Sequence, residues 1–169
     1  ISVNISAKDF YYTDLYKTFT GLTQKYGIAP GNLNLEITET ALMSDLQHHM
    51  ETLTRLQDYG FVIELDDFGS GYSSLNMLKD ITADVLKIDM LFLRETEHTV
   101  RNRIILQSVI SMAKQLGMAV IMEGVETEEQ LESLKKMGCE LFQGYYFSRP
   151  ISVEEFEQKY IGGTARKGI

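Results

Sequence analysis

The sequence predicts an α/β protein built on a parallel sheet. Apolar segments of about five residues alternate along the chain with helical segments of about ten to twenty residues. Four helical segments end at a glycine, and a strand follows soon after Gly27, Gly60, Gly117 and Gly138. This alternation joins parallel strands through right-handed crossovers. A (β/α)-barrel and an open doubly wound sheet both fit, but no glycine-rich phosphate fingerprint follows the first strand, which weakens the Rossmann interpretation.

Size and composition are those of one globular domain. The chain has 169 residues, of which 44% are hydrophobic, and no apolar run approaches the roughly 18–20 residues of a membrane span. The net charge of −8 argues against binding a nucleic-acid polymer, although a small phosphate ester held through metal ions is compatible with it. Cys139 is the single cysteine, which suits a reducing cytoplasm, and we expect it to be a small buried apolar residue.

We expect six strands, each followed by a helix. The strands are predicted at residues 1–5, 33–37, 61–65, 85–88, 118–122 and 141–146. The helices are predicted at residues 6–26, 44–59, 74–79, 100–116 and 127–137, with a last helix that begins after Ser152. Capping-box pairs support four of these starts, namely Ser6 with Asp9, Ser44 with Gln47, Thr127 with Gln130 and Ser152 with Glu155. We expect residues 162–169 to form a frayed tail.

Two adjacent acids after the third predicted strand are unusual. Asp66 and Asp67 stand at the end of the apolar segment 61–65, directly before a loop that contains Gly69 and Gly71. Adjacent carboxylates repel each other, and two divalent ions that share one bridging carboxylate would neutralise the pair. An acidic turn is the alternative interpretation, because Asp and Gly are common in loops.

Other polar residues also lie at the C-terminal ends of the predicted strands. They are Asn4, Glu36, Glu39, Lys87, Asp89, Glu123, Glu126 and Gln143. In a parallel barrel these ends meet on one face, where active sites are built. Carboxylate and amide oxygens suit hard ions such as Mg²⁺, Mn²⁺ or Ca²⁺, whereas the sequence has no His/Cys cluster for zinc.

Alternation within the strands indicates which of these side chains point inward. The apolar residues of segment 33–37 place Glu36 on the opposite face, which is the interior of a barrel. Lys87 has apolar neighbours on both sides and is placed in the same manner. A lone interior acid is costly unless it is ligated. His48 and His49 are neighbours in a helix that face different ways, and we expect both at surface or boundary positions.

Several of these residues also have a purely structural interpretation. Glu39 fits an acid in the first turn of a helix, where the helix dipole favours it. Asp89 fits a helix cap or an ion pair with Lys87. The aromatic residues at 145–147 fit core and rim packing better than stacking on a base.

Six segments, in this order along the chain, resemble the EAL domain, the bacterial phosphodiesterase of cyclic di-GMP. They are Val-Asn-Ile-Ser (3–6), Leu-Glu-Ile-Thr-Glu (35–39), Asp-Asp-Phe-Gly-Ser-Gly-Tyr-Ser-Ser-Leu (66–75), Leu-Lys-Ile-Asp (86–89), Glu-Gly-Val-Glu (123–126) and Gln-Gly-Tyr-Tyr-Phe-Ser-Arg-Pro (143–150). The resemblance covers nearly the whole chain. It implies a (β/α)₈ TIM-type barrel, of which this chain holds about six of the eight strands, and hydrolysis of cyclic di-GMP to linear pGpG with two Mg²⁺ or Mn²⁺ ions.

The resemblance also implies a role for each matching residue. Asn4, Glu36 and Asp66 match ligands of one metal, and Asp66, Asp67 and Glu123 match ligands of the second, with Asp66 as the bridge. Lys87 matches a lysine that holds the nucleophilic water and the phosphate, and Glu126 matches a supporting acid. Gln143 matches a glutamine near the substrate, and we assign Asp67 to substrate binding with it. Glu39 matches a glutamate that steadies the loop after Asp67, which is linked to dimerisation.

The Glu-Ala-Leu segment that gives the family its name is absent from this sequence. In the family it lies upstream of the Val-Asn-Ile-Ser strand, and its glutamate is a ligand of the first metal. We therefore expect residues 1–161 to be an N-terminally incomplete EAL domain that is poorly active or inactive alone. We also expect fusion to an upstream sensor or cyclase-like domain, a homodimer, and a cytoplasmic location.

Three other functions remain open. The first is a catalytically inactive sensor that binds cyclic di-GMP, the second is a dimerisation or regulatory module, and the third is an unrelated metal-dependent barrel enzyme. Degenerate sensor domains usually lose acids from the motifs. All the acids of the matching motifs, with Lys87, are present here, and this favours catalysis.

Overall fold

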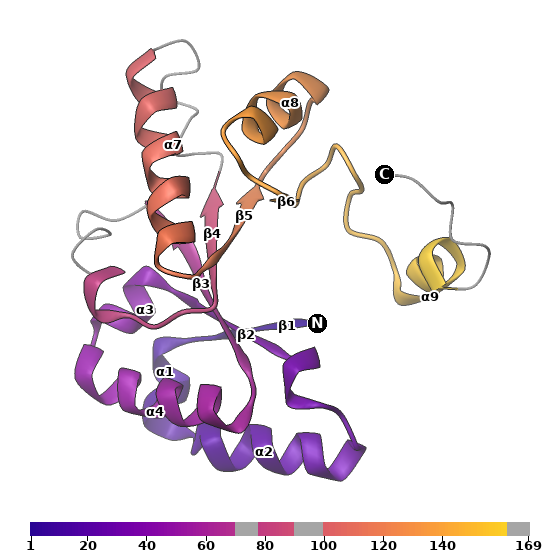
Figure 1. The fold of residues 1–169 in the computed structure, drawn as a ribbon. Helices are drawn as coiled ribbons and strands as arrows, with labels where there is room; N and C mark the ends of the chain where they lie inside the picture. Colours follow the sequence, from indigo (N-terminus) through magenta and orange to yellow (C-terminus); the bar gives the residue numbers. More distant parts are fainter. Residues whose placement is uncertain (70–77, 90–99, 162–169) are drawn as a thin grey trace.

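The chain forms one parallel sheet with helical crossovers (Figure 1). The computed structural model describes residues 1–69, 78–89 and 100–161, and over these ranges the sheet has six strands. They are β1 (Ser2–Ile5), β2 (Asn34–Thr38), β3 (Val62–Phe68), β4 (Val85–Asp89), β5 (Ala119–Glu123) and β6 (Leu141–Phe142). The strands lie side by side in sequence order, and every neighbouring pair is parallel. A doubly wound sheet would reverse this order, so the arrangement favours consecutive strands of a barrel.

Helices connect the strands. They are α1 (Ala7–Tyr12), α2 (Leu15–Tyr26), α3 (Glu39–Met43), α4 (Leu46–Tyr59), α7 (Val100–Gln115), α8 (Glu128–Lys136) and α9 (Val153–Phe156), together with the 3₁₀ helix η1 (Pro30–Asn32) and the π-helical turn η2 (Glu157–Ile161). Helices α1, α2 and α4 lie together at one end of the molecule, whereas α9 stands apart from the other helices (Figure 1). None of the helices in the described ranges is long and apolar enough to cross a bilayer.

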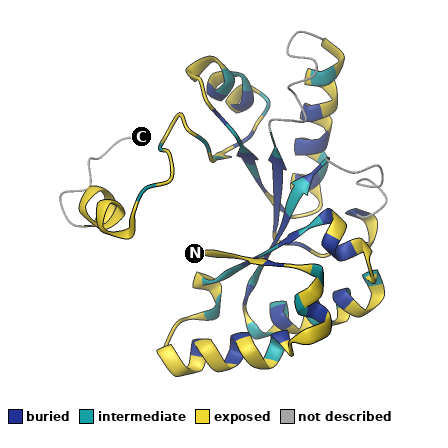
Figure 2. Cartoon of the chain, turned by 180° about the vertical axis from the view of Figure 1, so that it is seen from behind, coloured by how far each residue is buried: buried dark blue, intermediate teal, exposed yellow. Residues whose placement is uncertain are grey.

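The core lies between one face of the sheet and these helices (Figure 2). Its largest fully buried side chains are Leu35, Ile37, Leu65, Leu86, Ile88 and Met122 from the strands, and Leu42, Leu53, Leu56, Leu106 and Ile110 from the helices. Burying one such side chain contributes roughly 1.5–3 kcal/mol. Because side chains alternate along a strand, this packing turns the residues between them toward the other face. The prediction that Glu36 lies opposite its apolar neighbours is therefore confirmed.

The single helix predicted at residues 6–26 is wrong, because the chain forms two helices there. Helix α1 ends at Thr13, which is extended with φ −133° and ψ 132°. The Asp14 carboxylate then accepts a hydrogen bond of 3.0 Å from the backbone N–H of Lys17 and opens α2. An aspartate with a free N–H three residues later can start a new helix inside an otherwise helical pattern.

The predicted start at Ser44 is also wrong. Helix α3 begins directly after β2, where the Thr38 hydroxyl accepts a hydrogen bond of 3.2 Å from the Ala41 N–H. Ser44 lies at the C-terminus of α3 and donates to the Ala41 carbonyl oxygen. Asp45 is the residue that caps α4, accepting from the N–H of His48 at 3.4 Å.

The other capping predictions are confirmed in position. The Ser6 backbone N–H donates to the Asp9 carboxylate at 2.9 Å. Thr127 and Gln130 form a reciprocal capping box at the start of α8. Ser152 accepts from the Glu155 N–H at 3.2 Å. Of the helix predicted at 74–79, residues 78 and 79 are described and helical, whereas its other residues and the predicted tail at 162–169 lie outside the described ranges.

The sixth strand is shorter than predicted. Strand β6 ends at Phe142, and the prediction of a strand through residue 146 is wrong. After Phe142 the backbone bonds to the loop that follows β5, with the Tyr146 N–H donating to the Val125 carbonyl oxygen at 3.0 Å. This loop pairing takes the place of further pairing with β5.

His49 contradicts the expectation of a surface or boundary position, because it is fully buried. Its ring stacks on Phe10 with centroids 4.0 Å apart, and Nδ1 lies 3.1 Å from the Leu42 carbonyl oxygen. A carbonyl only accepts, so Nδ1 carries the proton. His48 is exposed, as expected. Cys139 is buried, as expected, and burial raises the pKa of its thiol.

Candidate active site

Four adjacent strands bring one lysine and three carboxylates to one place. The Nζ atom of Lys87 on β4 lies 2.5 Å from Glu36 Oε1 on β2 and 2.8 Å from Glu123 Oε1 on β5. It lies 3.2 Å from Asp66 Oδ1 on β3. The four side chains are only 5–16% exposed. We call these four residues the Lys87 cluster, and its charges are stable under burial only because they are paired.

The Lys87 cluster has more negative than positive charge. Burial lowers the pKa of Lys87, but hydrogen bonds with Glu123 and Glu36 and the attraction of Glu123 and Asp66 outweigh it, and the pKa rises above its usual value. Burial raises the pKa of Glu123, opposed by Lys87 and reinforced by Asp66 and Glu36. Three carboxylates around one ammonium group favour the entry of further positive charge.

Asp66 and Asp67 lie within β3 rather than at its end, which corrects the sequence prediction. The register between β3 and β4 shifts between Leu65 and Phe68, and Asp67 has a φ of 56°. A register shift of this kind re-aims side chains, as a β-bulge does beside active sites. Burial, followed by the charges of Asp66 and Asp89, raises the pKa of Asp67 against the effect of Lys87.

One acceptor in the Lys87 cluster is unsatisfied. Asp66 Oδ1 is buried and has no hydrogen-bond partner among the described residues, although Lys87 Nζ is 3.2 Å away. Buried acceptors in native proteins are nearly always hydrogen-bonded or ligated. This oxygen therefore marks a point where a cation would be stabilised.

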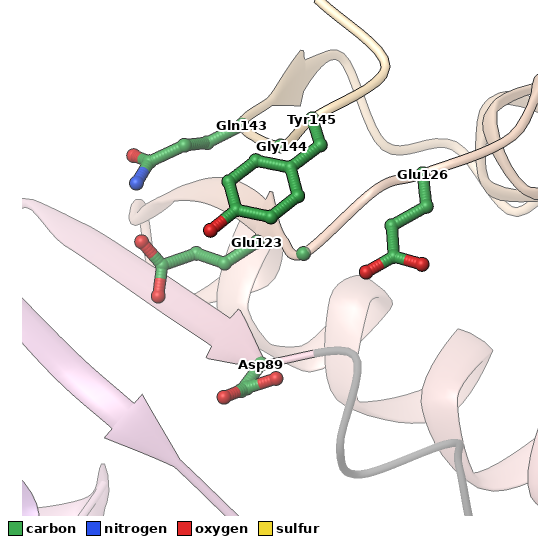
Figure 3. Close-up of a pocket in the computed structure, with 7 residues that line it drawn as sticks. Asp89, Glu123, Glu126, Gln143, Gly144 and Tyr145 are labelled. Carbon is green, nitrogen blue, oxygen red and sulfur yellow. The ribbon is translucent and has the colours of Figure 1, made fainter. Parts of the chain in front are cut away.

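A pocket of about 360 Å³ opens beside Glu123 (Figure 3). It is lined by Asp89, Glu123, Gly124, Glu126, Gln143, Gly144 and Tyr145. Figure 3 shows the carboxylates of Asp89, Glu123 and Glu126 around the same hollow, with the ring of Tyr145 above them. Glu126, Gln143 and Tyr145 are exposed, so the Lys87 cluster is the buried end of this region and the pocket is its open side.

Backbone hydrogen bonds hold the two loops that line the pocket. The Gln143 N–H donates to the Met122 carbonyl oxygen at 2.8 Å, and the Val125 N–H donates to the Gln143 carbonyl oxygen at 3.1 Å. A Cβ atom at Gly144 would overlap the backbone nitrogen, carbon and oxygen of Val125, so only glycine fits there. The loop after β5, which carries Glu126, is in this way tied to the loop that carries Gln143.

The remaining predicted residues lie outside the Lys87 cluster. Asn4 on β1 is in register with Glu36 on β2 and is exposed. Glu39 is buried as the first residue of α3. The loop that Glu39 was expected to support continues into residues 70–77, which lie outside the described ranges.

Sequence reasoning missed a further interior acid, Glu64. It is 2% exposed, and its Oε1 accepts a hydrogen bond of 2.8 Å from Asn34 Nδ2. Its Oε2 is buried without a hydrogen-bond partner in the described part of the chain. Glu64 precedes Asp66 by two residues on the same strand, so the alternation that placed Glu36 could also have placed Glu64.

The Lys87 cluster has donor atoms that suit a divalent cation, but they are not arranged in a coordination geometry. Within residues 1–69, 78–89 and 100–161, no group of three or more His, Cys, Asp and Glu side chains is arranged to hold a metal ion. The ammonium group of Lys87 lies at the point that Glu36, Asp66 and Glu123 share. Three carboxylates, one with an unsatisfied oxygen, form the donor set that Mg²⁺ or Mn²⁺ prefers.

Fold and site together define a barrel-type protein with an acidic site at the carboxyl ends of its strands, and comparison identifies the family. The EAL domain family model matches residues 1–150. The chain belongs to the EAL domain family, and its six-stranded sheet is part of a (β/α)₈ barrel.

Relatives of known name and structure agree with this family. The cyclic di-GMP phosphodiesterase NbdA of Pseudomonas aeruginosa is 39% identical over 95% of this chain, which spans only 21% of NbdA. The PaMucR phosphodiesterase in complex with c-di-GMP is 36% identical, with a TM-score of 0.84 over 92% of this chain and 63% of that chain. Klebsiella pneumoniae BlrP1, solved with manganese and cyclic di-GMP, is 31% identical, with a TM-score of 0.82 over 88% of this chain and 38% of that chain.

Proposed function

We propose that this chain is part of a metal-dependent phosphodiesterase that hydrolyses cyclic di-GMP to linear pGpG. The Lys87 cluster carries the proposal. Its three carboxylates, from adjacent strands of an EAL domain, would attract cations, and one of them, Glu123, also lines the open pocket. The name of NbdA and the ligand in the PaMucR structure support the choice of substrate. Because the chain is net negative, a dianionic substrate requires positive charge at the site.

The proposal gives each residue a task. Asn4, Glu36 and Asp66 would hold one cation, and Asp66, Asp67 and Glu123 the second. Bound Mg²⁺ or Mn²⁺ would stabilise the charge that develops on the phosphodiester and lower the pKa of a water molecule. The manganese in BlrP1 supports a divalent cation here.

The other residues act on the substrate side. Lys87 would add a positive charge where the phosphoryl group gains negative charge. Glu126 and Gln143 border the pocket, where they would orient the water and the substrate, and Glu39 would steady the loop after Asp67. In the reaction the water gives up a proton and its oxygen bonds to phosphorus, the bond from phosphorus to the 3′ oxygen breaks, and that oxygen takes up a proton.

The proposal extends to the parent protein. We propose that residues 1–161 belong to one EAL domain in a longer cytoplasmic protein with an upstream sensor or cyclase-like domain, and that the domain forms a homodimer. The length of NbdA, of which the chain matches about a fifth, supports the longer protein.

Hydrolysis by the full-length protein tests the proposed function. We expect pGpG to form with Mg²⁺ or Mn²⁺, and chelation with EDTA to stop the reaction reversibly. Asp66→Ala should lower the rate by at least about 10²–10³-fold, because it removes the carboxylate proposed to hold both cations that stabilise the charge on the phosphodiester. Asp58→Ala, which removes an exposed acid of α4, is the matched control and should leave the rate unchanged. Binding of cyclic di-GMP without hydrolysis by the wild type would establish the inactive sensor instead.

A further inference from the structure

We propose that Lys87 sets the metal affinity of the candidate site, because its ammonium group and a divalent cation compete for the same carboxylate oxygens. The proposal rests on the metal site of the proposed function, but not on the identity of the substrate or on hydrolysis. It assigns Lys87 a role before any substrate binds.

The geometry of the Lys87 cluster produces this competition. Its three carboxylate oxygens come from three different strands, and each lies within 2.5–3.2 Å of the single atom Nζ. Protein oxygens bind Mg²⁺ at about 2.0–2.1 Å and Ca²⁺ at about 2.3–2.6 Å. A divalent ion that binds these oxygens would therefore lie close to Nζ, where the two positive charges repel each other.

Burial determines which group must move when a divalent cation competes with Lys87 for the carboxylates. The side chain of Lys87 is 5% exposed, so the ammonium group has little contact with water while it pairs with the acids. The backbone on either side is fixed, since Leu86 and Ile88 are fully buried in the core. The side chain of Lys87 must therefore give up contacts with Glu36, Asp66 and Glu123 as the metal enters.

Lys87 also has an organising effect, because it holds three carboxylates together that would otherwise repel. One contact in the Lys87 cluster favours competition as the larger of the two effects. Asp66 Oδ1 lies near Nζ without a hydrogen bond, so Lys87 satisfies the three acids incompletely. Removing the ammonium group leaves all three carboxylates for the metal, and the added attraction outweighs the lost organisation.

Manganese binding without substrate tests this competition in the full-length protein. Calorimetric titration with Mn²⁺ would compare the wild type with Lys87→Met, which keeps an unbranched side chain only one atom shorter and removes its charge. We expect Lys87→Met to bind Mn²⁺ at least tenfold more tightly. Lys114→Met is the matched control, because Lys114 on α7 pairs with Glu140 at a more exposed position; it should change the affinity by less than about twofold.

The outcomes separate this proposal from the proposed function. Equal or weaker Mn²⁺ binding by Lys87→Met, while the wild type binds, overturns the competition alone. Absence of Mn²⁺ binding in every variant overturns the metal site and this proposal with it. A wild type that binds Mn²⁺ with the expected difference but does not hydrolyse cyclic di-GMP supports the competition and contradicts only the proposed activity.

A measurement on the wild type keeps the test decisive if Lys87→Met does not fold. Amine-specific labelling, read by mass spectrometry, would follow Lys87 and Lys114 with and without Mg²⁺. We expect labelling of Lys87 to increase several-fold at saturating Mg²⁺, because the ammonium group leaves its three carboxylates, whereas labelling of Lys114 stays constant. Unchanged or reduced labelling of Lys87 would overturn the proposal.

Discussion

At the scale of single residues, Gly144 links the fold to the candidate site. A Cβ atom there would overlap the backbone of Val125, whose N–H and carbonyl oxygen are bonded to Gln143 and Tyr146. Neither loop can yield without losing these bonds. We expect Gly144→Ala to lower the hydrolytic rate at least tenfold and the melting temperature by several degrees, as measured on the full-length protein.

Gly21 provides a control of opposite sign. It lies inside α2, and a Cβ atom there would meet nothing within 4 Å. Gly21→Ala should therefore stabilise the fold by roughly 0.5–1 kcal/mol through helix propensity, with no change in rate. Similar effects of the two substitutions would show that the contact between the loops at Gly144 does not shape the site.

The buried thiol of Cys139 allows a prediction about pH. Burial raises its pKa, and backbone hydrogen bonds of Leu141, Glu140 and Met122 oppose this rise only in part. The folded thiol therefore stays protonated where an unfolded one ionises, so its contribution to stability is lost as the pH rises above the usual thiol pKa. Iodoacetamide at pH 8.5 should modify Cys139 slowly in the native protein and rapidly in guanidinium. Rapid modification of native protein would contradict this.

Alternation along strands made part of the candidate site predictable at this scale. Glu36 and Lys87 alternate with fully buried apolar residues, and the structure brings them together in one cluster. The positive φ at Asp67 and the burial of His49 were not predictable. A positive φ has no local signal at an aspartate, and His49 is buried because Phe10, distant in sequence, stacks on its ring.

At the scale of elements, the sequence interpretation and the structure assign different N-cap residues to α4. Asp45, rather than Ser44, caps this helix. We expect Asp45→Ala to destabilise the fold by about 1 kcal/mol, the usual cost of removing a cap. Ser44→Ala removes a hydroxyl whose hydrogen bond goes to a helix carbonyl and should cost less. Chemical denaturation of both variants measures the difference, and a larger loss with Ser44→Ala would restore the sequence interpretation.

The existence of the elements was easier to predict than their ends. All six strands occur where apolar runs predicted them, because a strand buried against helices requires such a run. The ends depend on competing partners. Asp14 divides the predicted helix 6–26 by capping α2, and the chain after β6 leaves the sheet because its backbone bonds to Val125. The sequence shows which donors and acceptors are available at these ends, but not which of them pair in the folded chain.

At the scale of the whole molecule, the order of the strands places the site. Consecutive parallel strands align their carboxyl ends, so acids far apart in sequence, such as Glu36 and Glu123, lie within reach of one lysine. This convergence was predictable once the alternation of strands and helices indicated a parallel sheet. The position of Nζ between the acids was not, because it depends on the side-chain packing of four strands together.

The open sheet leads to a last prediction, that residues 1–169 alone hydrolyse cyclic di-GMP poorly. Within the described part of the chain, β1 and β6 each pair with one strand, and the residues from Ser2 to Asn4 are exposed. Unpaired strand edges and an uncovered barrel interior favour association with other chains over a closed site. Light scattering and binding of a hydrophobic dye should therefore both be higher for residues 1–169 than for the full-length protein, at equal molar concentration. The rate of pGpG formation should be lower by at least tenfold. If residues 1–169 stay monomeric and hydrolyse as fast as the full-length protein, this part of the barrel suffices, and residues 1–169 contain the complete catalytic set.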